Sequence, residues 1–179
     1  MVLAYDTELS LLAAVELVNS AEDPDTLTTV DQADMWYAKH QYTGRRDRDE
    51  AELASLRAVR PVLRELFTAD RDTAAEMVNK MLAQAVALPR LVRHDMLDWH
   101  LHAVSPDEPL VTRVLVETAM AMVDLVRVDE MSRLSVCSDD TCAGIVLDLT
   151  RNRSRRFCST ACANRNAVAA YRARARSKS

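Results

Sequence analysis

The chain has 179 residues, of which 49% are hydrophobic, and this is enough for one domain of ordinary size and a small additional module. Its two glycines and five prolines favour helices over a turn-rich β fold. The formal charge of −4 is unevenly divided, because residues 151–179 carry +9 and residues 1–150 therefore carry −13. No apolar run reaches the length of a membrane span, so we expect no membrane partner.

Apolar positions at helical spacing predict that residues 1–131 form a helical domain. Thr7 is placed to cap the first helix. Pro61 is expected to kink the third, because proline removes a backbone donor and clashes with the preceding turn. The last predicted helix starts at Pro109 or Leu110, and it could pair two chains in a homodimer. The predicted helices cover residues 7–19, 30–40, 49–69, 73–87 and 110–131.

Residues 89–104 depart from the helical period. Two series of side chains alternate here, one from Leu91 through Asp95 to Ala103 and the other from Val92 through Met96. Alternation of this kind is typical of a half-buried strand. The sequence therefore predicts a β-hairpin or a pair of short strands.

Three histidines lie in this segment. His100 and His102 share one face of the predicted strand, and His94 is near them in the sequence. A metal site or a pH switch is one interpretation. Exposed strand histidines are the simpler interpretation, because no acid or thiol partner is evident.

All four cysteines of the chain lie near its C-terminal end. Their spacing is C-x4-C, a fifteen-residue connection and then C-x3-C. Two close pairs joined by a longer connection are typical of a zinc site with four thiolate ligands. Four thiolates leave no coordination position open, so the spacing predicts one structural Zn²⁺. The predicted ligands are Cys137, Cys142, Cys158 and Cys162.

Two disulfides, or four unrelated buried thiols, are the alternatives. The first twelve residues include Asp6 and Glu8 and lack the basic start of a signal peptide. This indicates a reducing compartment, where paired cysteines bind metal more often than they form disulfides. Unrelated core thiols would not be expected to cluster in pairs at one end.

The segments around the cysteines have their own pattern. Residues 145–149 form a short apolar run that predicts one strand of a small hairpin, with residues 148–154 as its polar loop. Ser159 can cap a helix that begins at Thr160. On this helix Arg165, Arg172 and Arg176 fall on one side, whereas Arg174 falls on the opposite side.

The basic residues after residue 150 indicate a nucleic-acid partner, because phosphate contacts need positive charges gathered on one surface. A disordered basic tail is a fair alternative for residues 174–179. Asn164 could read a base edge, as could Asn166, although both fit equally well as helix-start residues. The predicted nucleic-acid contacts are Arg151, Arg153, Arg155, Arg156, Asn164, Arg165, Arg172 and Arg176.

Residues 148–159, followed by Cys162-Ala-Asn-Arg165 and an arginine-rich helix, resemble the CGNR zinc finger. Leu17-Val-Asn-Ser20 resembles a short signature of ABATE, the helical domain that precedes this finger in its family. The resemblance implies two domains, residues 1–131 and 132–179. Ala163 replaces the glycine of the family motif, which matters if that glycine permits close approach to DNA.

The resemblance also implies a function. Proteins of this family are regarded as stress-induced bacterial transcription regulators whose N-terminal domain senses a signal. Polar residues beside apolar positions could line a ligand pocket of that domain, although surface charges and helix caps are the simpler interpretation. These residues are Asn19, Arg57, Arg60, Arg64 and Asn79.

Enzyme motifs are missing from the sequence. There is no H-x-E with P-C-x-x-C, no P-loop, no G-x-S-x-G and no H-E-x-x-H. We therefore expect a binding protein, namely a DNA-binding transcription regulator located in the cytoplasm with the nucleoid. The alternative is a zinc-stabilised module that binds protein or RNA without sequence-specific DNA binding.

Overall fold

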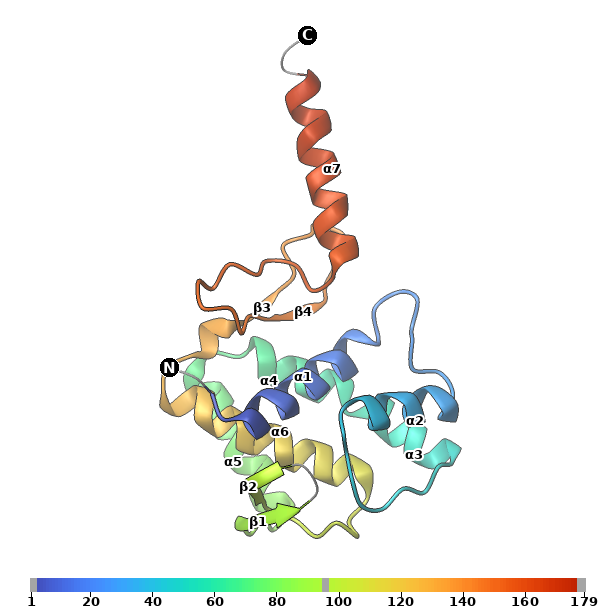
Figure 1. Cartoon of the computed structure of the whole chain (residues 1–179), viewed down its shortest axis with the longest axis vertical. Coiled ribbons are helices and arrows are strands. Elements are labelled where there is room, and N and C mark those ends of the chain that lie inside the picture. Colours follow the sequence, from blue (N-terminus) through green and yellow to red (C-terminus); the bar gives the residue numbers. More distant parts are fainter. Residues whose placement is uncertain (1–2, 95–96, 177–179) are drawn as a thin grey trace.

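The computed structural model describes residues 3–94 and 97–176, and the side chains of residues 94, 97 and 98 are also outside the description. The expectations for Asp95, Met96, Lys178 and the His94 side chain therefore concern parts of the chain outside the described residues. The described part is mainly helical, with a small β-hairpin and a four-cysteine module at its C-terminal end, which confirms the predicted fold class (Figure 1).

Helices and short strands follow one another along the chain in a simple order. They are α1 (Tyr5–Asn19), α2 (Val30–Lys39), α3 (Glu50–Ala58), α4 (Arg60–Thr68), α5 (Arg71–Gln84), β1 (Arg90–His94), β2 (Leu97–His102), α6 (Leu110–Arg127), the 3-10 turn η1 (Met131–Arg133), β3 (Leu134–Val136), β4 (Ile145–Leu147) and α7 (Thr160–Arg176).

Helix α6 is the main packing element of the helical body. It packs against both α1 and α5, and its side chains Val114, Met122 and Leu125 are fully buried. This apolar face is covered within the chain, and the suggestion that residues 110–131 pair two chains stays a prediction. A homodimer formed through another surface stays a prediction.

Some helix starts follow local capping chemistry, whereas α1, α4 and α6 have no side-chain cap. Thr29 and Gln32 form a reciprocal capping box at α2, and Asp70 accepts hydrogen bonds from the first amides of α5. Helix α1, however, begins at Tyr5. Thr7 therefore lies inside it, and its buried hydroxyl donates to Asp124 at 2.6 Å. The predicted Thr7 cap is wrong because a long-range partner takes the hydroxyl.

The long helix predicted for residues 49–69 is two helices. Helix α3 ends at Ala58, and Pro61 lies in the first turn of α4. A proline at this position loses nothing, because the first amides of a helix have no partner within it. The break turns Arg60 inward, where it is buried and donates to Asp25 at 2.8 Å. The interpretation of Arg60 as a surface charge is therefore wrong.

Strands β1 and β2 form the predicted hairpin between α5 and α6. They pair antiparallel, with Leu91 opposite Leu101 and Val92 opposite His100. His100 is buried, and its Nε2 lies 3.0 Å from Nε2 of His102. The expectation of exposed strand histidines is therefore wrong for His100, because the hairpin folds this face toward the helices.

A second hairpin joins the cysteine module to the helical body. Strand β4 pairs with β3, which precedes it. The hairpin loop is thus the segment between them, and residues 148–154 instead lead from β4 toward Cys158. The prediction that residues 148–154 form this loop is wrong, because the partner strand lies on the other side in the sequence.

Strand β4 contributes to two apolar clusters at once. Ile145 and Leu147 are buried in the main core with α1 and α4, whereas Val146 packs with Cys137 and Cys162. Successive side chains of a strand point to opposite faces, so one strand can do both. The cysteine module is therefore packed onto the helical body through its own strand.

Helix α7 projects away from the rest of the molecule (Figure 1). Its first turns contact the cysteine module through Arg165 and Asn166, and among its described residues Cys162 is buried. Among the described residues, no helix combines the length and the apolar character that a membrane crossing requires.

Candidate metal centre and nucleic-acid surface

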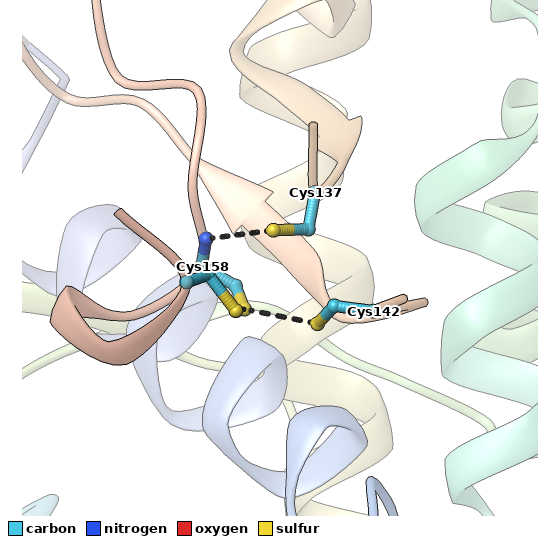
Figure 2. A group of neighbouring side chains, drawn as sticks. Cys137, Cys142 and Cys158 are labelled. Carbon is cyan, nitrogen blue, oxygen red and sulfur yellow. Dashed lines mark hydrogen bonds between the residues drawn. The ribbon is translucent and has the colours of Figure 1, made fainter. Parts of the chain in front are cut away.

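Four sulfur atoms gather where the second hairpin meets the start of α7, and Figure 2 shows Cys137, Cys142 and Cys158 of this group. Cys137 follows β3, Cys142 precedes β4, Cys158 ends the long connection, and Cys162 lies in α7. All four sulfur atoms lie within 4.8 Å of one another. The structure thus brings together the four predicted ligands from two separate pairs.

The spacing of the sulfur atoms fits tetrahedral zinc. A Zn–S distance of about 2.3 Å gives a tetrahedron with S–S edges of about 3.8 Å. The Sγ atoms of Cys142 and Cys158 are 3.5 Å apart, and those of Cys158 and Cys162 are 3.8 Å apart. Four thiolates complete the coordination of Zn²⁺, so the site holds one structural zinc ion.

The protonation of the thiols follows from their crowding. Burial raises the pKa of the Cys142 and Cys158 thiols. A hydrogen bond with the Ser159 side chain lowers the pKa of Cys162. A divalent cation supplies the charge that stabilises four thiolates in so small a space, so metal binding is coupled to loss of the thiol protons.

Backbone and side-chain N–H groups surround the sulfur atoms. The amide of Gly144 lies 3.4 Å from Cys142 Sγ, and the amide of Cys158 lies 3.4 Å from Cys137 Sγ. The Nη2 atom of Arg165 lies 3.3 Å from Cys162 Sγ. Donors of this kind orient metal ligands and offset their negative charge.

Asp139 ties the first cysteine pair to α7, and sequence reasoning missed it. Its buried carboxylate accepts from Arg165 Nε at 2.8 Å and from Asn166 Nδ2 at 2.7 Å. The hydrogen bond from Arg165, followed by those from the Thr141 hydroxyl and amide, lowers the pKa of Asp139 to about 2. The signal was available in the sequence, because Asp139-x-Thr141 is a local turn motif between two cysteines.

The same motif recurs after β4. Asp148 accepts from the amide and hydroxyl of Thr150, at 2.8 Å and 2.6 Å, and from the amide of Arg155 at 2.7 Å. These bonds fold the polar connection back toward Cys158. This turn could also have been predicted from the sequence, since it has the same Asp-x-Thr pattern.

Gly144 is required by the sulfur cluster. A Cβ atom at this position would lie 2.9 Å from Cys158 Sγ and 3.3 Å from Cys142 Sγ. Gly144→Ala is therefore expected to push two ligands apart and to lower zinc affinity by roughly 10- to 100-fold, the usual effect of disturbing the surroundings of metal ligands. Competition with a chromophoric chelator measures the affinity. Ser135→Ala, at an exposed position of β3, is the control, and an unchanged affinity for Gly144→Ala would contradict the expectation.

Asn19, at the end of α1, joins the two parts of the chain. Its Oδ1 accepts from the amide of Ile145 at 2.6 Å, and its Nδ2 donates to the carbonyl of Ile145 at 2.8 Å. Glu22 accepts from the amide of Ala143, while Arg64 donates to the carbonyl of Ala143. Asn19 and Arg64 were considered as pocket or surface residues, but the structure places both at this joint.

The predicted nucleic-acid residues divide into two groups. One group lies on the connection between β4 and α7, where Arg151, Arg153, Arg155 and Arg156 are exposed. Among them, Arg153 makes an ion pair with Glu130 at 2.6 Å. The other group lies on α7, where Asn164, Arg165, Arg172 and Arg176 are exposed.

Residues of the first turns of α7 differ in their attachment. Arg165 is held by Asp139, so its charge is partly balanced. Asn166 Nδ2 donates to the same carboxylate and to the Cys162 carbonyl, the latter at 3.0 Å, and the reading of a base edge by Asn166 stays a prediction. Ala163 lies within the helix, where alanine is favoured over glycine.

Fold and site together define a zinc-finger protein, in which a C-terminal four-cysteine finger is packed onto a helical domain. The family models agree with this class. Residues 133–175 match the model described as "CGNR zinc finger", and residues 12–129 match the ABATE model, described as "Putative stress-induced transcription regulator". The second match covers more than half of the chain, so the chain belongs to the ABATE family, and a CGNR zinc finger follows the ABATE domain.

The descriptions of the two matching models name a transcription regulator and a zinc finger, and neither description names an enzyme. A search of curated proteins finds no match to the chain.

Proposed function

We propose that the protein is a DNA-binding transcription regulator whose finger contacts duplex DNA through α7 and the connection that precedes it. The observation that carries this proposal is the separation of charge. The segment from residue 151 onward carries +9, and the first 150 residues carry −13. A surface that neutralises phosphates gains affinity by releasing counterions, whereas an acidic domain is repelled by DNA.

The shape of α7 supports the same proposal. The helix projects from the body and is exposed beyond its first turns (Figure 1), and the major groove of DNA admits an α-helix. Arg172 and Arg176 lie on one side of it, about one turn apart. Asn164 is exposed near its start, where an amide side chain could pair with adenine.

We place the signal-sensing step in the helical domain. Helix α1 contacts the finger through Asn19 and Ile145, and α6 leads into β3 through η1. A change in these two helices would therefore reach the finger. In this proposal the protein is a regulator and not an enzyme, acts in the cytoplasm with the nucleoid, and a second copy of the chain remains a proposed partner.

A protein- or RNA-binding module is the second candidate. Its supporting observation is that α7 also exposes apolar side chains, with Val168 at 48% and Tyr171 at 68% of their full exposure. Such side chains can pack on a protein partner or stack on an unpaired base. Parallel titrations with duplex DNA and single-stranded RNA separate the two candidates.

The arginines of α7 provide the sharpest test. If about six basic residues contact phosphate, log K should fall with log salt at a slope near −5. Arg172→Ala is then expected to weaken binding to all sequences about equally and to flatten this slope by about one. Arg174→Ala, on the opposite side of the helix, should have the smaller effect. Fluorescence anisotropy with duplex DNA over a range of salt concentrations measures both variants.

Two outcomes decide the matter. Equal losses for Arg172→Ala and Arg174→Ala would mean that the helix binds as an unordered polycation, which contradicts an ordered phosphate contact. Asn164→Ala tests base reading, because a base contact should cost roughly 1–3 kcal/mol on the preferred site and little on other sites.

A further inference from the structure

A cavity of about 260 Å³ lies in the helical domain, beside the first half of α1. It is bounded by the first half of α1, by the second half of α6, by β2 and by the connection between α2 and α3. One wall is apolar and includes Leu9, Ala13 and Met120. Ligand pockets are mostly apolar clefts of about 300–1,000 Å³, so this partly apolar cavity, just below that range, suits a small organic molecule.

Tyr42 lines this cavity, and its buried hydroxyl has no partner among the described residues. The side chain is only 8% exposed. A buried hydroxyl that makes no hydrogen bond costs free energy. Such a group in a cavity wall is explained if a ligand completes its hydrogen bonding.

Glu117 is the second polar group of the cavity. Burial raises its pKa to about 7, although the charge of Arg113 acts in the opposite direction. Arg113 cannot turn freely toward it, because its guanidinium donates to the backbone carbonyls of Thr43, Arg45 and Glu108. Tyr42 and Glu117 line the same cavity, and burial, followed by the Glu117 charge, raises the pKa of the Tyr42 hydroxyl. Glu117 therefore lacks a mobile counterion of its own.

The remaining charged groups favour a positive ligand over a negative one. Of the described residues that line the cavity, three are carboxylic acids and Arg127 is the one permanent cation. Asp6 and Asp124 already accept hydrogen bonds from Thr7. The His100 and His102 Nε2 atoms are 3.0 Å apart, and a hydrogen bond at this distance requires one of the two nitrogens to be unprotonated.

We infer that this cavity binds a small organic cation, a protonated amine on an apolar body, with the Glu117 carboxylate as its counterion and the Tyr42 hydroxyl as its hydrogen-bond partner. The apolar body lies against Leu9, Ala13 and Met120. The ammonium group supplies the charge that the desolvated carboxylate needs, and it can donate to the hydroxyl oxygen at the same time.

This ligand deepens the proposed sensing step, and its regulatory meaning rests on the proposed function. The route is short, because α1 lines the cavity with its first half and ends at Asn19, which holds the finger. Ligand binding itself is measured without DNA, so a failure of DNA binding and a failure of ligand binding are separate results.

Three probes of similar size and different charge test the inference on the full-length, zinc-loaded protein. Benzylamine is cationic, benzyl alcohol is neutral and benzoate is anionic at neutral pH. Isothermal titration calorimetry is expected to show benzylamine binding at least about tenfold more tightly than benzyl alcohol, since a hydrogen-bonded charge contributes more than a neutral contact. Benzoate should bind most weakly of the three.

Two variants and one control place the binding in this cavity. Glu117→Gln should abolish the preference for benzylamine over benzyl alcohol. Tyr42→Phe removes a hydroxyl that has no partner in the described structure, so it should fold at least as well as the natural chain, and it should weaken benzylamine binding about fivefold. Glu65→Gln removes the same charge at an exposed position, and it should leave the affinity for benzylamine unchanged.

Any of three results would overturn the inference. These are equal affinity for the three probes, tighter binding of benzoate than of benzylamine, and no binding of benzylamine in the millimolar range. Unchanged selectivity in both Glu117→Gln and Tyr42→Phe would equally exclude this cavity as the site.

Discussion

Replacing Cys158 with serine is expected to release the zinc ion and to unfold the finger. The finger has little apolar core of its own, since Val146 and Phe157 are the side chains that pack around its cysteines. Structural zinc contributes about 10–16 kcal/mol in small modules, and a binding free energy of this size is also the folding free energy of the module. Removal of one of the four thiolates should therefore both release the zinc ion and unfold the finger.

The structure extends this expectation to the helical domain. Leu134, Ile145 and Leu147 of the finger hairpin are buried in the core that contains α1 and α4. Full burial of such a side chain stabilises by about 1.5–3 kcal/mol, so loss of the hairpin should lower the melting temperature of the helices while leaving them folded. A finger that merely hung from a flexible linker would leave that temperature unchanged.

Elemental analysis and hydrogen exchange measure the two effects of Cys158→Ser. Zinc should fall from one ion per chain to none, and the amides of residues 137–170 should lose protection. Ser138→Ala, an exposed change in the same module, is the control, and it should retain both the zinc ion and the amide protection. Zinc retained by the Cys158 variant, or no zinc in the natural protein purified without a chelator, would rule out the site.

Asn19→Ala is expected to loosen the finger from the helical domain without removing its zinc. The change deletes two hydrogen bonds, of 2.6 Å and 2.8 Å, to the amide and the carbonyl of Ile145. Both backbone groups are then left without their partner in the buried strand β4. An unsatisfied buried group costs about 1–3 kcal/mol, so we expect a loss of about 2–4 kcal/mol in the free energy of unfolding.

Urea denaturation, zinc analysis and hydrogen exchange together test this expectation. The free energy of unfolding should fall, one zinc ion per chain should remain, and the amides of β3 and β4 should exchange faster. Asn79→Ala is a matched control, because Asn79 is exposed on α5. Equal losses for the two asparagines would show that Asn19 has no special part in holding the finger.

The zinc ligands could be predicted from the sequence, because their evidence is local. Each cysteine pair is closed within one short segment, and thiolate chemistry restricts what such pairs can do. The start of α7 at Thr160 was local as well, since Ser159 caps it through the amide of Cys162. The DNA contacts proposed for Arg172 and Asn164 also came from the sequence, and they stay predictions.

Residues whose role depends on a distant partner could not be predicted. Asn19 was only one polar residue beside apolar positions until the fold placed it against Ile145, 126 residues later. Arg60 was interpreted as a surface charge until the break before α4 turned it toward Asp25. Tyr42 and Glu117 drew no attention, because a cavity is formed only when separate helices pack together.

The sequence by itself determined the helical class, the four-thiolate zinc site and the division of charge between the two parts of the chain. These follow from residue type, spacing and short-range geometry. Only the tertiary structure decided that β4 is shared between the finger and the helical core, that Asn19 fastens the two together, and that a partly apolar cavity lies beside α1. The physical reason is that burial and pairing between distant segments depend on how the helices pack, and the residues of either segment alone do not specify that packing.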